Sequence, residues 1–316
     1  MLRKARLIAG IVVLVASARP ALGQQSAASP GKRLAITVDD LPINGPDTGL
    51  AELRQINARI LAALLEAKVP AVGFVNEEKL YRDGEVAGRI ALLDAWLAAG
   101  LELGNHTYSH PDLNKVGVAA YEEEVVRGET VLRLLCEKHK AKLRLFRHTF
   151  LRTGRSREEK AAFESFLVAR GYQVAPVTLE NDDWYFNSKY VTARELGDTA
   201  MMRRIGDAYL AHWTTMFEWY EALSQQLLSR PMDHVILMHQ NAINAERLPE
   251  VLSLMRARGY SFASLDEVLK DPAYAHADNY IGGWGKSWLQ RWAFTEGIDT
   301  LGKEPDPPGW VMKLYP

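Results

Sequence analysis

Short apolar runs alternate with helix-like segments along most of the chain, and this alternation limits the possible folds more than any other feature. The strand-like runs are LAITVDD, VPAVGFVN, LELGNHT, LRLFRHTF, YQVAPVTLEND, HVILMHQN and YSFASL. Between them, apolar periodicity predicts helices at about 50–67, 86–99, 118–140, 155–170, 193–228 and 245–258. A repeated strand–helix–strand order predicts a parallel sheet with crossover helices.

Most of the strand-like runs are apolar along their length rather than alternating, which is typical of strands covered on both faces. About seven such units in roughly 240 residues favour a single α/β barrel, and an open doubly wound sheet is the competing architecture. The predicted helix at 193–228 is longer than one crossover requires, so we interpret it as an insertion.

The first residues differ from the rest of the chain. A basic start is followed by an apolar stretch at 7–16 and a small-residue exit at 21–23. This pattern predicts a secretory signal peptide over residues 1–23. The alternative is a transmembrane anchor, but the apolar run is well short of the roughly 20 residues that span a bilayer. We therefore expect a soluble mature protein without a stable membrane anchor, secreted and located in the periplasm.

Charge and cysteine content exclude several classes of protein. The chain has 38 Lys and Arg residues against 39 Asp and Glu residues, so no global field attracts it to nucleic acid or to an anionic membrane. Cys136 is the only cysteine, which rules out an intrachain disulfide framework. The function must therefore be sought in local sites. The oligomeric state stays open.

Polar side chains stand where the strand-like runs end. They are Asp39, Asp40, Asn76, His106, His110, Arg147, His148, Asp182, Asp183, Trp184, His239, Gln240 and Asn241. Singly, each is more often a helix cap, a turn former or a satisfied surface group than a functional residue. Because the carboxyl ends of parallel strands form one rim, however, the whole set is expected to converge there.

The segment HTYSH adds a specific spacing to this rim. In a helical turn, residues i and i+4 lie on one side, so the imidazoles of His106 and His110 could reach the same point. Two histidines and a carboxylate from another strand make a three-ligand site for a zinc-like divalent cation, with a position left for water. The alternative is that both rings simply cap a helix that begins at Thr107.

Five segments in this order, TVDDLP, HTYSH, FRHTF, NDDW and VILMHQ, resemble the motif series of the polysaccharide deacetylases that share the rhizobial chitooligosaccharide deacetylase domain. The resemblance covers about residues 33–269. It implies a distorted (β/α)7 barrel, which agrees with the strand count. We therefore expect a catalytic barrel domain at 32–270 and an aromatic-rich C-terminal extension at 271–316 that packs on the barrel.

The resemblance also implies roles for residues of the first three motifs. The metal ligands would be Asp40, His106 and His110, usually for Zn²⁺. Asp39 would be the general base, which explains why a core strand ends in two carboxylates. Arg147 would orient Asp39 and keep its pKa low.

The last two motifs would supply the acid. His239 would protonate the leaving group, and Asp183, or Glu180 if the motif is offset, would pair with His239 and keep it charged near neutral pH. An amide needs this help, because it is a poor electrophile with a poor leaving group. Bound metal would polarise the acetyl carbonyl and acidify water, whose proton Asp39 would accept.

Three positions depart from the family pattern. Leu41 stands where the first motif usually has glycine, Thr149 replaces a proline in the third, and Gln240 follows the last histidine in place of an acidic or small polar residue. None of these changes removes a ligand or a proton carrier. They weaken the inference of a particular substrate.

The leading hypothesis is therefore a secreted metal-dependent deacetylase that acts on an N- or O-acetylated saccharide. The alternatives are a hydrolase of a cyclic imide, a ureide or another small non-peptide amide, and an inactive glycan-binding module. Trp284, Trp288 and Trp292 recur at i, i+4 and i+8, which predicts one helical face. This face either packs a terminal helix on the barrel, the interpretation we favour, or offers a platform for sugars.

Overall fold

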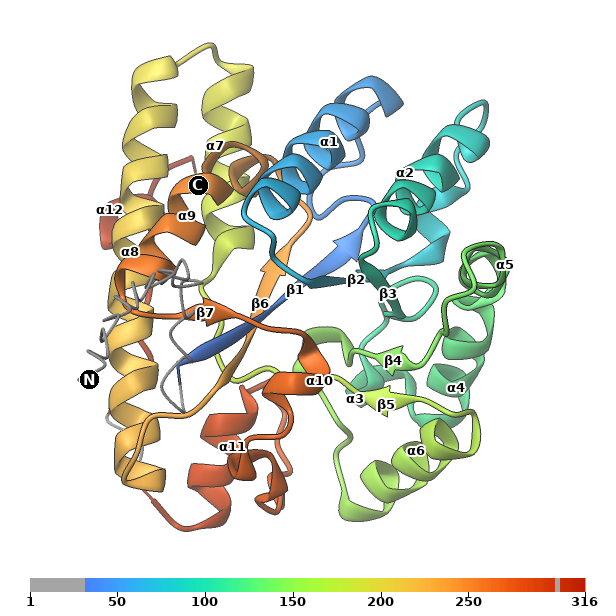
Figure 1. Ribbon diagram of the computed structural model, residues 1–316, viewed down its shortest axis with the longest axis vertical. Coiled ribbons are helices and arrows are strands. Elements are labelled where there is room, and N and C mark those ends of the chain that lie inside the picture. The colour runs from blue at the N-terminus through green and yellow to red at the C-terminus, as the bar shows by residue number, and fades with distance from the viewer. Residues whose placement is uncertain (1–31, 299–301, 316) are drawn as a thin grey trace, which may run out of the picture.

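A curled sheet of seven strands runs through the middle of the computed structural model, which describes residues 32–298 and 302–315 (Figure 1). The strands are β1 (Arg33–Leu41), β2 (Ala71–Val75), β3 (Glu102–Asn105), β4 (Leu145–Phe146), β5 (Gln173–Val174), β6 (His234–His239) and β7 (Ser261–Phe262). All pairs among these strands are parallel, which confirms the predicted α/β architecture. The predicted signal peptide at 1–23 lies outside the described residues.

The order of strands shows how the sheet closes. It runs β5-β4-β3-β2-β1-β6, and β7 pairs with the start of β1. The chain segment 173–179 joins the two ends of this order, because β5 pairs with β4 while Leu179 forms a parallel bridge with Ile236 of β6. The segment thus completes the distorted barrel that the sequence predicts.

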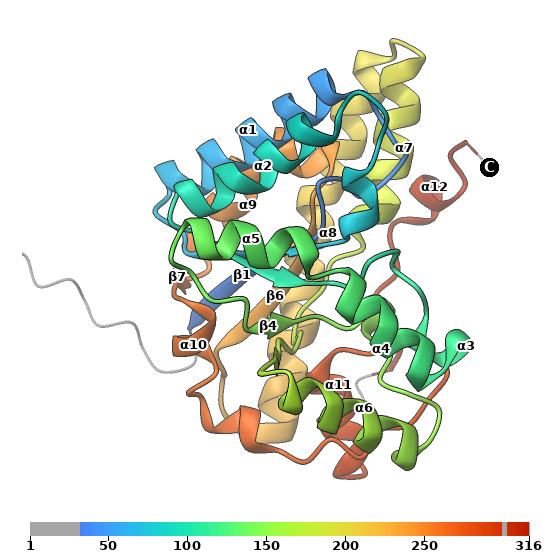
Figure 2. The ribbon, with the colours of Figure 1, turned by 90° about the vertical axis from the view of Figure 1, so that its right-hand side faces the viewer.

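Helices cover the outside of the barrel (Figures 1 and 2). They are α1 (Leu50–Glu66), α2 (Val86–Ala98), α3 (Leu113–Val116), α4 (Val118–Arg127), α5 (Thr130–Lys138), α6 (Arg157–Ala169), α7 (Asp183–Glu195), α8 (Thr199–Leu228), α9 (Ala242–Ala257), α10 (Leu265–Val268), α11 (Trp288–Thr295) and α12 (Gly309–Met312), with 3₁₀ turns at Glu77–Leu80, Thr149–Leu151 and Pro272–Ala275.

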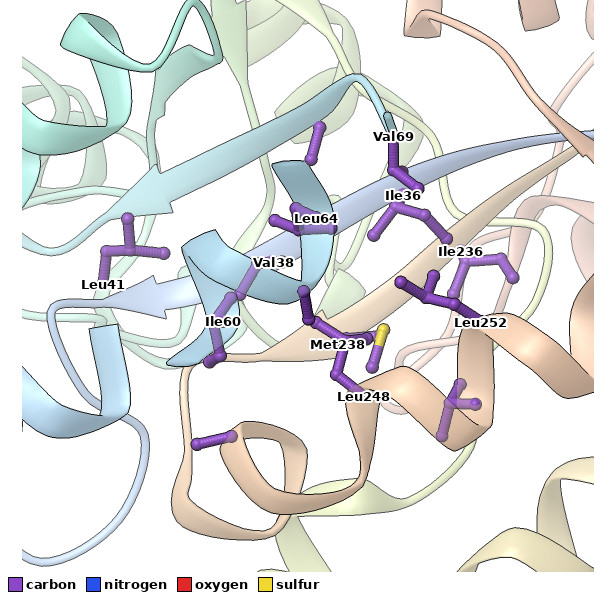
Figure 3. Packing of buried hydrophobic residues seen from close by; sticks show 14 of the residues in the cluster. Ile36, Val38, Leu41, Ile60, Leu64, Val69, Ile236, Met238, Leu248 and Leu252 are labelled. Carbon is purple, nitrogen blue, oxygen red and sulfur yellow. The ribbon is translucent and has the colours of Figure 1, made fainter. Parts of the chain in front are cut away.

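The core lies between the sheet and these helices. Val38 of β1 and Met238 of β6 are buried in one apolar cluster with Ile60 of α1 and Leu248 of α9 (Figure 3). The apolar residues of α1 recur at helical spacing, so one face of the helix is buried against the sheet. This packing fixes β1 and β6, whose carboxyl ends carry Asp39, Asp40 and His239.

The helix predicted at 118–140 is wrong as a single element, because it breaks at Gly128 into α4 and α5. A Cβ atom at Gly128 would lie 2.6 Å from the backbone carbon of Thr107, so only glycine allows this approach. Beside the break, the amide of Tyr108 donates to the carbonyl oxygen of Glu124 at 3.0 Å. The break therefore allows the HTYSH loop to pack against the C-terminal end of α4.

The helix predicted at 193–228 also divides. Gly197, at φ 70°, ends α7, and Asp198 caps α8 by accepting a hydrogen bond from the amide of Met201 at 2.9 Å. The run predicted as a strand at 172–182 is regular only over β5, since Pro176 has no amide hydrogen to continue a ladder.

The C-terminal part of the described chain packs against the barrel. Trp292 of α11 is buried, and the amide of Trp288 donates to the carbonyl oxygen of Val177 at 2.6 Å. The predicted common helical face of three tryptophans is wrong for Trp284, because α11 begins at Trp288. Trp284 lies in the preceding loop, with 76% of its surface exposed. The domain boundary at 270 stays a prediction.

Candidate metal centre

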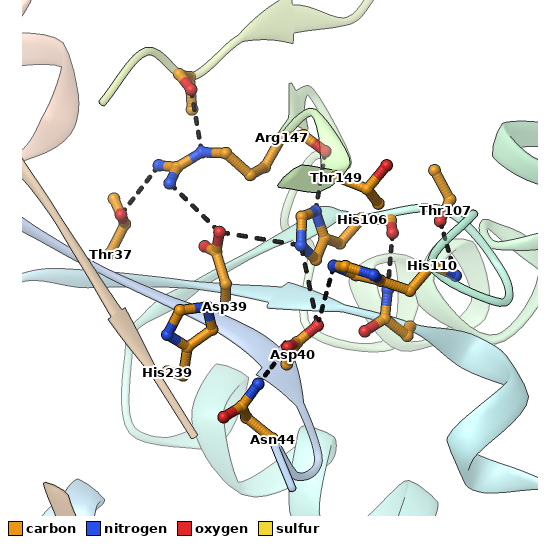
Figure 4. A network of polar contacts seen from close by, with 12 residues as sticks. Thr37, Asp39, Asp40, Asn44, His106, Thr107, His110, Arg147, Thr149 and His239 are labelled. Carbon is orange, nitrogen blue, oxygen red and sulfur yellow. Dashed lines mark hydrogen bonds and ion pairs between the residues drawn. The ribbon is translucent and has the colours of Figure 1, made fainter. Parts of the chain in front are cut away.

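Asp39 and Asp40 lie where the pairing of β1 becomes irregular. Asp39 pairs in register with His239 of β6, whereas the register toward β2 shifts between Val38 and Leu41. Asp40 has a φ of 68°, a region that residues other than glycine rarely adopt. Neighbouring side chains of a regular strand point to opposite faces. The irregularity brings both carboxylates to the same imidazole, since each has an oxygen 3.8 Å from Nε2 of His106 (Figure 4).

The two histidines of HTYSH lie in a loop between β3 and α3. The prediction that they share a helical turn is wrong, because the loop is not helical and has a φ of 70° at Thr107 and 59° at His110. The amide of Thr107 donates to Oδ1 of Asn105 at 2.7 Å, and the amide of His110 donates to Oγ1 of Thr107 at 3.1 Å. This local folding still brings the rings of His106 and His110 to a centroid distance of 4.9 Å.

Asp40, His106 and His110 form one group whose potential ligand atoms all lie within 4.8 Å of one another. Oδ1 of Asp40 is 3.5 Å from Nε2 of His110. Nδ1 of His106 donates to the carbonyl oxygen of Arg147 at 2.8 Å, which leaves Nε2 as the acceptor on the side of Asp40. Burial holds the pKa of His106 well below its ordinary value, so its imidazole is neutral, the form that binds metals.

The chemistry of this group fits a divalent cation. Oδ1 of Asp40 is buried and has no hydrogen-bond partner. A buried carboxylate oxygen without a hydrogen bond is costly unless a positive charge compensates it, and Nζ of Lys79, 3.3 Å away, is one such charge. Two imidazole nitrogens and one carboxylate oxygen are also a ligand set that zinc takes in sites with three protein ligands. These three residues therefore form a possible site for a divalent cation.

Lys79 brings a competing charge to the same carboxylate. Its Nζ lies 3.3 Å from Oδ1 of Asp40 and donates to Oδ1 of Asn76 at 2.8 Å. Burial acts to raise the pKa of Asp40, but Lys79 and the nearby histidines outweigh it and lower this pKa below its usual range. An ammonium group so close to the ligand set repels a bound cation.

Lys79→Met is expected to raise the affinity for Zn²⁺ about tenfold or more, because it removes this repulsion. Calorimetric titration of the metal-free protein with Zn²⁺ measures the effect. Lys115→Met is the matched control, since Lys115 is exposed on α3. Weaker Zn²⁺ binding in the Lys79 variant would show instead that the lysine supports the metal site.

Arg147 holds the second carboxylate. Its Nη1 donates to Oδ2 of Asp39 at 3.3 Å, Nη2 to Oγ1 of Thr37 at 2.8 Å, and Nε to the carbonyl oxygen of Ala175 at 3.0 Å. The prediction that Arg147 keeps the pKa of Asp39 low is wrong, because burial raises this pKa to about 6 and Arg147 offsets burial only in part. Asp39 is nevertheless mostly ionised at neutral pH.

His239 lies across the strand pair from Asp39 and forms an ion pair with Asp183. Its Nδ1 donates to Oδ1 of Asp183 at 2.6 Å, and its backbone amide donates to Oδ2 of the same carboxylate at 2.7 Å. Burial acts to lower the pKa of His239, but Asp183 and the two carboxylates of β1 outweigh it and raise the pKa to about 9. Of the two partners that the sequence left open, Asp183 rather than Glu180 makes this hydrogen bond.

Asp183→Asn is expected to lower the pKa of His239 from about 9 to about 7 or below, because burial is then no longer outweighed by the largest favourable charge. Titration of the His239 ring resonances by NMR measures the change. Asp207→Asn, on the exposed face of α8, provides the control. A pKa that stays near 9 in the Asp183 variant would assign the shift to the carboxylates of β1.

One cavity of about 420 Å³ is lined by Asp39, Asp40, His106, His110 and His239, whereas Lys79, Arg147 and Asp183 are not among its lining residues. The other lining residues are Asn44, His148, Phe150, Leu151, Arg152, Glu180, Trp184, Leu237, Trp284 and Gly285. Sequence reasoning missed Asn44, whose Nδ2 donates to Oδ2 of Asp40 at 2.7 Å. Its position in a turn four residues after Asp40 was a usable signal. It also missed Arg152, and nothing in the periodicity indicates that the loop of Trp284 returns to this cavity.

Comparisons with known proteins agree with this geometry. Residues 26–162 match the model of the family described as polysaccharide deacetylase. A peptidoglycan-N-acetylglucosamine deacetylase of Bacillus cereus is 32% identical over 102 residues, which are 32% of this chain and 31% of that protein. The chain thus spans about a third of the length of this curated relative.

Solved structures share the fold. The wild-type protein BA3943 of Bacillus anthracis, described as a CE4 family pseudoenzyme, has a TM-score of 0.51 and 17% identity over 76% of this chain and 66% of its own. A mutant of BA3943 with restored enzymatic activity has a TM-score of 0.51 and 18% identity over 76% and 68% of the two chains. Among the helices that the structure describes, none is long and apolar enough to cross a membrane.

Proposed function

Because the chain belongs to the polysaccharide deacetylase family, we propose that it is a metal-dependent hydrolase that removes acetyl groups from an N- or O-acetylated saccharide. One observation carries the proposal. A potential metal-ligating group (Asp40, His106 and His110), a buried carboxylate (Asp39) and a charged imidazole (His239) meet at a single cavity. These are the parts that hydrolysis of an amide or ester requires.

Each group has a distinct part in the reaction. A divalent cation held by Asp40, His106 and His110 would polarise the acetyl carbonyl and acidify water. Asp39, oriented by Arg147, accepts a proton from the attacking water. His239 donates its proton to the nitrogen or oxygen of the sugar as the bond to the acetyl carbon breaks. The products are acetate and a free amine or hydroxyl group.

The protonation states of Asp39 and His239 support these roles as base and acid. Burial raises the pKa of Asp39 to about 6, and the pKa of His239 is raised to about 9 because Asp183 and the carboxylates of β1 outweigh burial. Between these values the carboxylate is ionised and the imidazole is charged, so base and acid are both ready in the free enzyme. A cation bound at Asp40 would lower both pKa values.

One structural neighbour is described as a pseudoenzyme, so family membership alone does not decide whether this chain is active. Asp39 and His239 favour activity, because metal binding by itself requires neither of them. The hydrogen bonds of Arg147 and Asp183 also hold both groups in defined orientations. A binding module would gain nothing from a buried acid and base with separated pKa values.

The saccharide and the location are proposed together. The predicted signal peptide at 1–23 would direct the protein to the periplasm or outside the cell, where envelope glycans are found. The B. cereus relative is, by its name, a deacetylase of peptidoglycan N-acetylglucosamine. The barrel at 32–270 would carry the chemistry, and the extension at 271–316 would pack on it. Zn²⁺ is the proposed metal.

Acetate release by the purified protein without residues 1–23 tests the proposal. The substrates are N-acetylglucosamine oligomers, peptidoglycan and acetylated xylan, each with chelator and with Zn²⁺ restored. Acetate release that chelator abolishes and Zn²⁺ restores is the expected result. No acetate from any substrate, with the metal bound, would favour a small cyclic amide as the substrate or a glycan-binding role.

A further inference from the structure

Trp284 is the most exposed large apolar residue at the cavity that holds the candidate site. It lines that cavity, although 76% of its surface is open to solvent. It comes from the loop before α11, far outside the residues that match the family model. The family resemblance therefore assigns it no role, and its position needs a separate explanation.

The backbone around Trp284 is held firmly. A Cβ atom at Gly285 would lie 1.8 Å from the carbonyl oxygen of Phe150, so the chain passes this rim loop at a distance that only glycine allows. The hydroxyl of Tyr280 donates to the carbonyl oxygen of Trp284 at 3.0 Å, and Nδ2 of Asn114 donates to that of Gly282 at 3.2 Å. The loop is thus fixed to the barrel rim, while the indole ring stays uncovered.

Trp284 belongs to an aromatic rim around the cavity. Phe150 and Trp184 also line it and are half exposed. The guanidinium of Arg152 lies 5.6 Å from the ring centre of Phe150 and 5.9 Å from that of Trp284, and it forms an ion pair with Asp112. The cation bridges the two rings and keeps the indole beside the cavity mouth.

We propose that Trp284 is a substrate-binding residue that stacks on a sugar unit next to the acetylated one, so that the protein prefers saccharide chains to single sugars. The inference rests on the proposed function and deepens it. One face of a pyranose ring carries C–H groups and is apolar, which suits a flat indole whose edges reach solvent. An uncovered aromatic ring on a fixed backbone also loses little conformational freedom when it binds.

Turnover gives the first test. For Trp284→Ala, the ratio of kcat/KM on the N-acetylglucosamine tetramer to kcat/KM on 4-nitrophenyl acetate is expected to fall about tenfold or more, mostly through KM for the tetramer. Trp284→Phe should recover most of this ratio. Trp310→Ala is the matched control, because Trp310 is a half-buried tryptophan on α12 that does not line the cavity. A ratio equal to that of the unmodified protein overturns the inference.

Binding separates this inference from the proposed function. In an Asp39→Asn background, calorimetry measures affinity for the N-acetylglucosamine tetramer and for acetylated xylotetraose without turnover. Loss of at least about tenfold in affinity on adding Trp284→Ala supports the stacking role. Equal affinity, or no binding of either tetramer by the parent, overturns it. Tetramer binding that depends on Trp284, together with no acetate release by the unmodified protein, would reject the deacetylase proposal alone.

Discussion

Asp39→Asn is expected to lower kcat for acetate release by about 10²–10⁴-fold, while Zn²⁺ stays bound. The amide has nearly the shape of the carboxylate and can still accept the hydrogen bond from Arg147, but it cannot accept a proton from water. The ligand group of Asp40, His106 and His110 does not include this residue. Acetate assays and metal content of the same preparation measure the two effects.

The control for this experiment is Asp207→Asn, which makes the same chemical change on the exposed surface of α8. Thermal unfolding of both variants shows whether the fold is kept, since the substitution at Asp39 leaves the buried guanidinium of Arg147 without its opposite charge. An Asp39→Asn protein that folds, binds Zn²⁺ and turns over at the original rate would reject the proposed base.

His106→Ala is expected to abolish both activity and metal retention, with an affinity for Zn²⁺ lower by more than about 100-fold. The imidazole is the central ligand of the group, because Nδ1 is fixed by the carbonyl oxygen of Arg147 and Nε2 lies near both carboxylates of β1. Two remaining ligands hold a divalent cation weakly. Calorimetric titration with Zn²⁺ and metal analysis after dialysis measure the loss.

The matched control is His276→Ala, because His276 lies in the C-terminal part of the chain and does not line the cavity. Added Zn²⁺ at high concentration should restore part of the activity of the His106 variant if Asp40 and His110 still bind it. Full metal retention without His106 would show that the cation is held elsewhere.

The order of the motifs was enough to predict the barrel and to place Asp39, Asp40, His106, His110 and His239 at one cavity, whereas Asn76, Asp182, Gln240 and Asn241 do not line it. Each candidate follows an apolar strand, and the carboxyl ends of parallel strands must gather on one side. Asp39, Asp40 and His239 could therefore be placed together, since they end neighbouring strands of the sheet.

Loop conformation was not predictable in the same way. The sequence pattern HTYSH has the spacing of a helical turn, yet Asn105 and Thr107 fold it differently through hydrogen bonds that periodicity does not encode. The net pKa of Asp39 also depends on how deeply the fold buries it, which neighbouring residues alone do not reveal. Trp284 reaches the cavity because Gly285 contacts Phe150, which is more than 100 residues earlier in the sequence. Hydrophobic periodicity predicts only local elements and gives no information on such contacts.

The segment at 173–179 that closes the barrel also has a consequence for local unfolding of the site. β5 has two residues, and toward β6 the amide of Thr178 donates to the carbonyl oxygen of Val235 at 2.9 Å and the amide of Leu237 to that of Leu179 at 3.0 Å, so a short ladder of backbone hydrogen bonds holds this seam. Four residues after this segment, Asp183 accepts the hydrogen bond from Nδ1 of His239. Local opening of this segment would separate Asp183 from the imidazole of His239. Asp40 on β1 and the two histidines that follow β3 would stay together as the ligand group. The protein could then lose its acid and still hold its metal, and the hydrogen-bonded amides of Thr178 and Leu237 would exchange together when the seam opens.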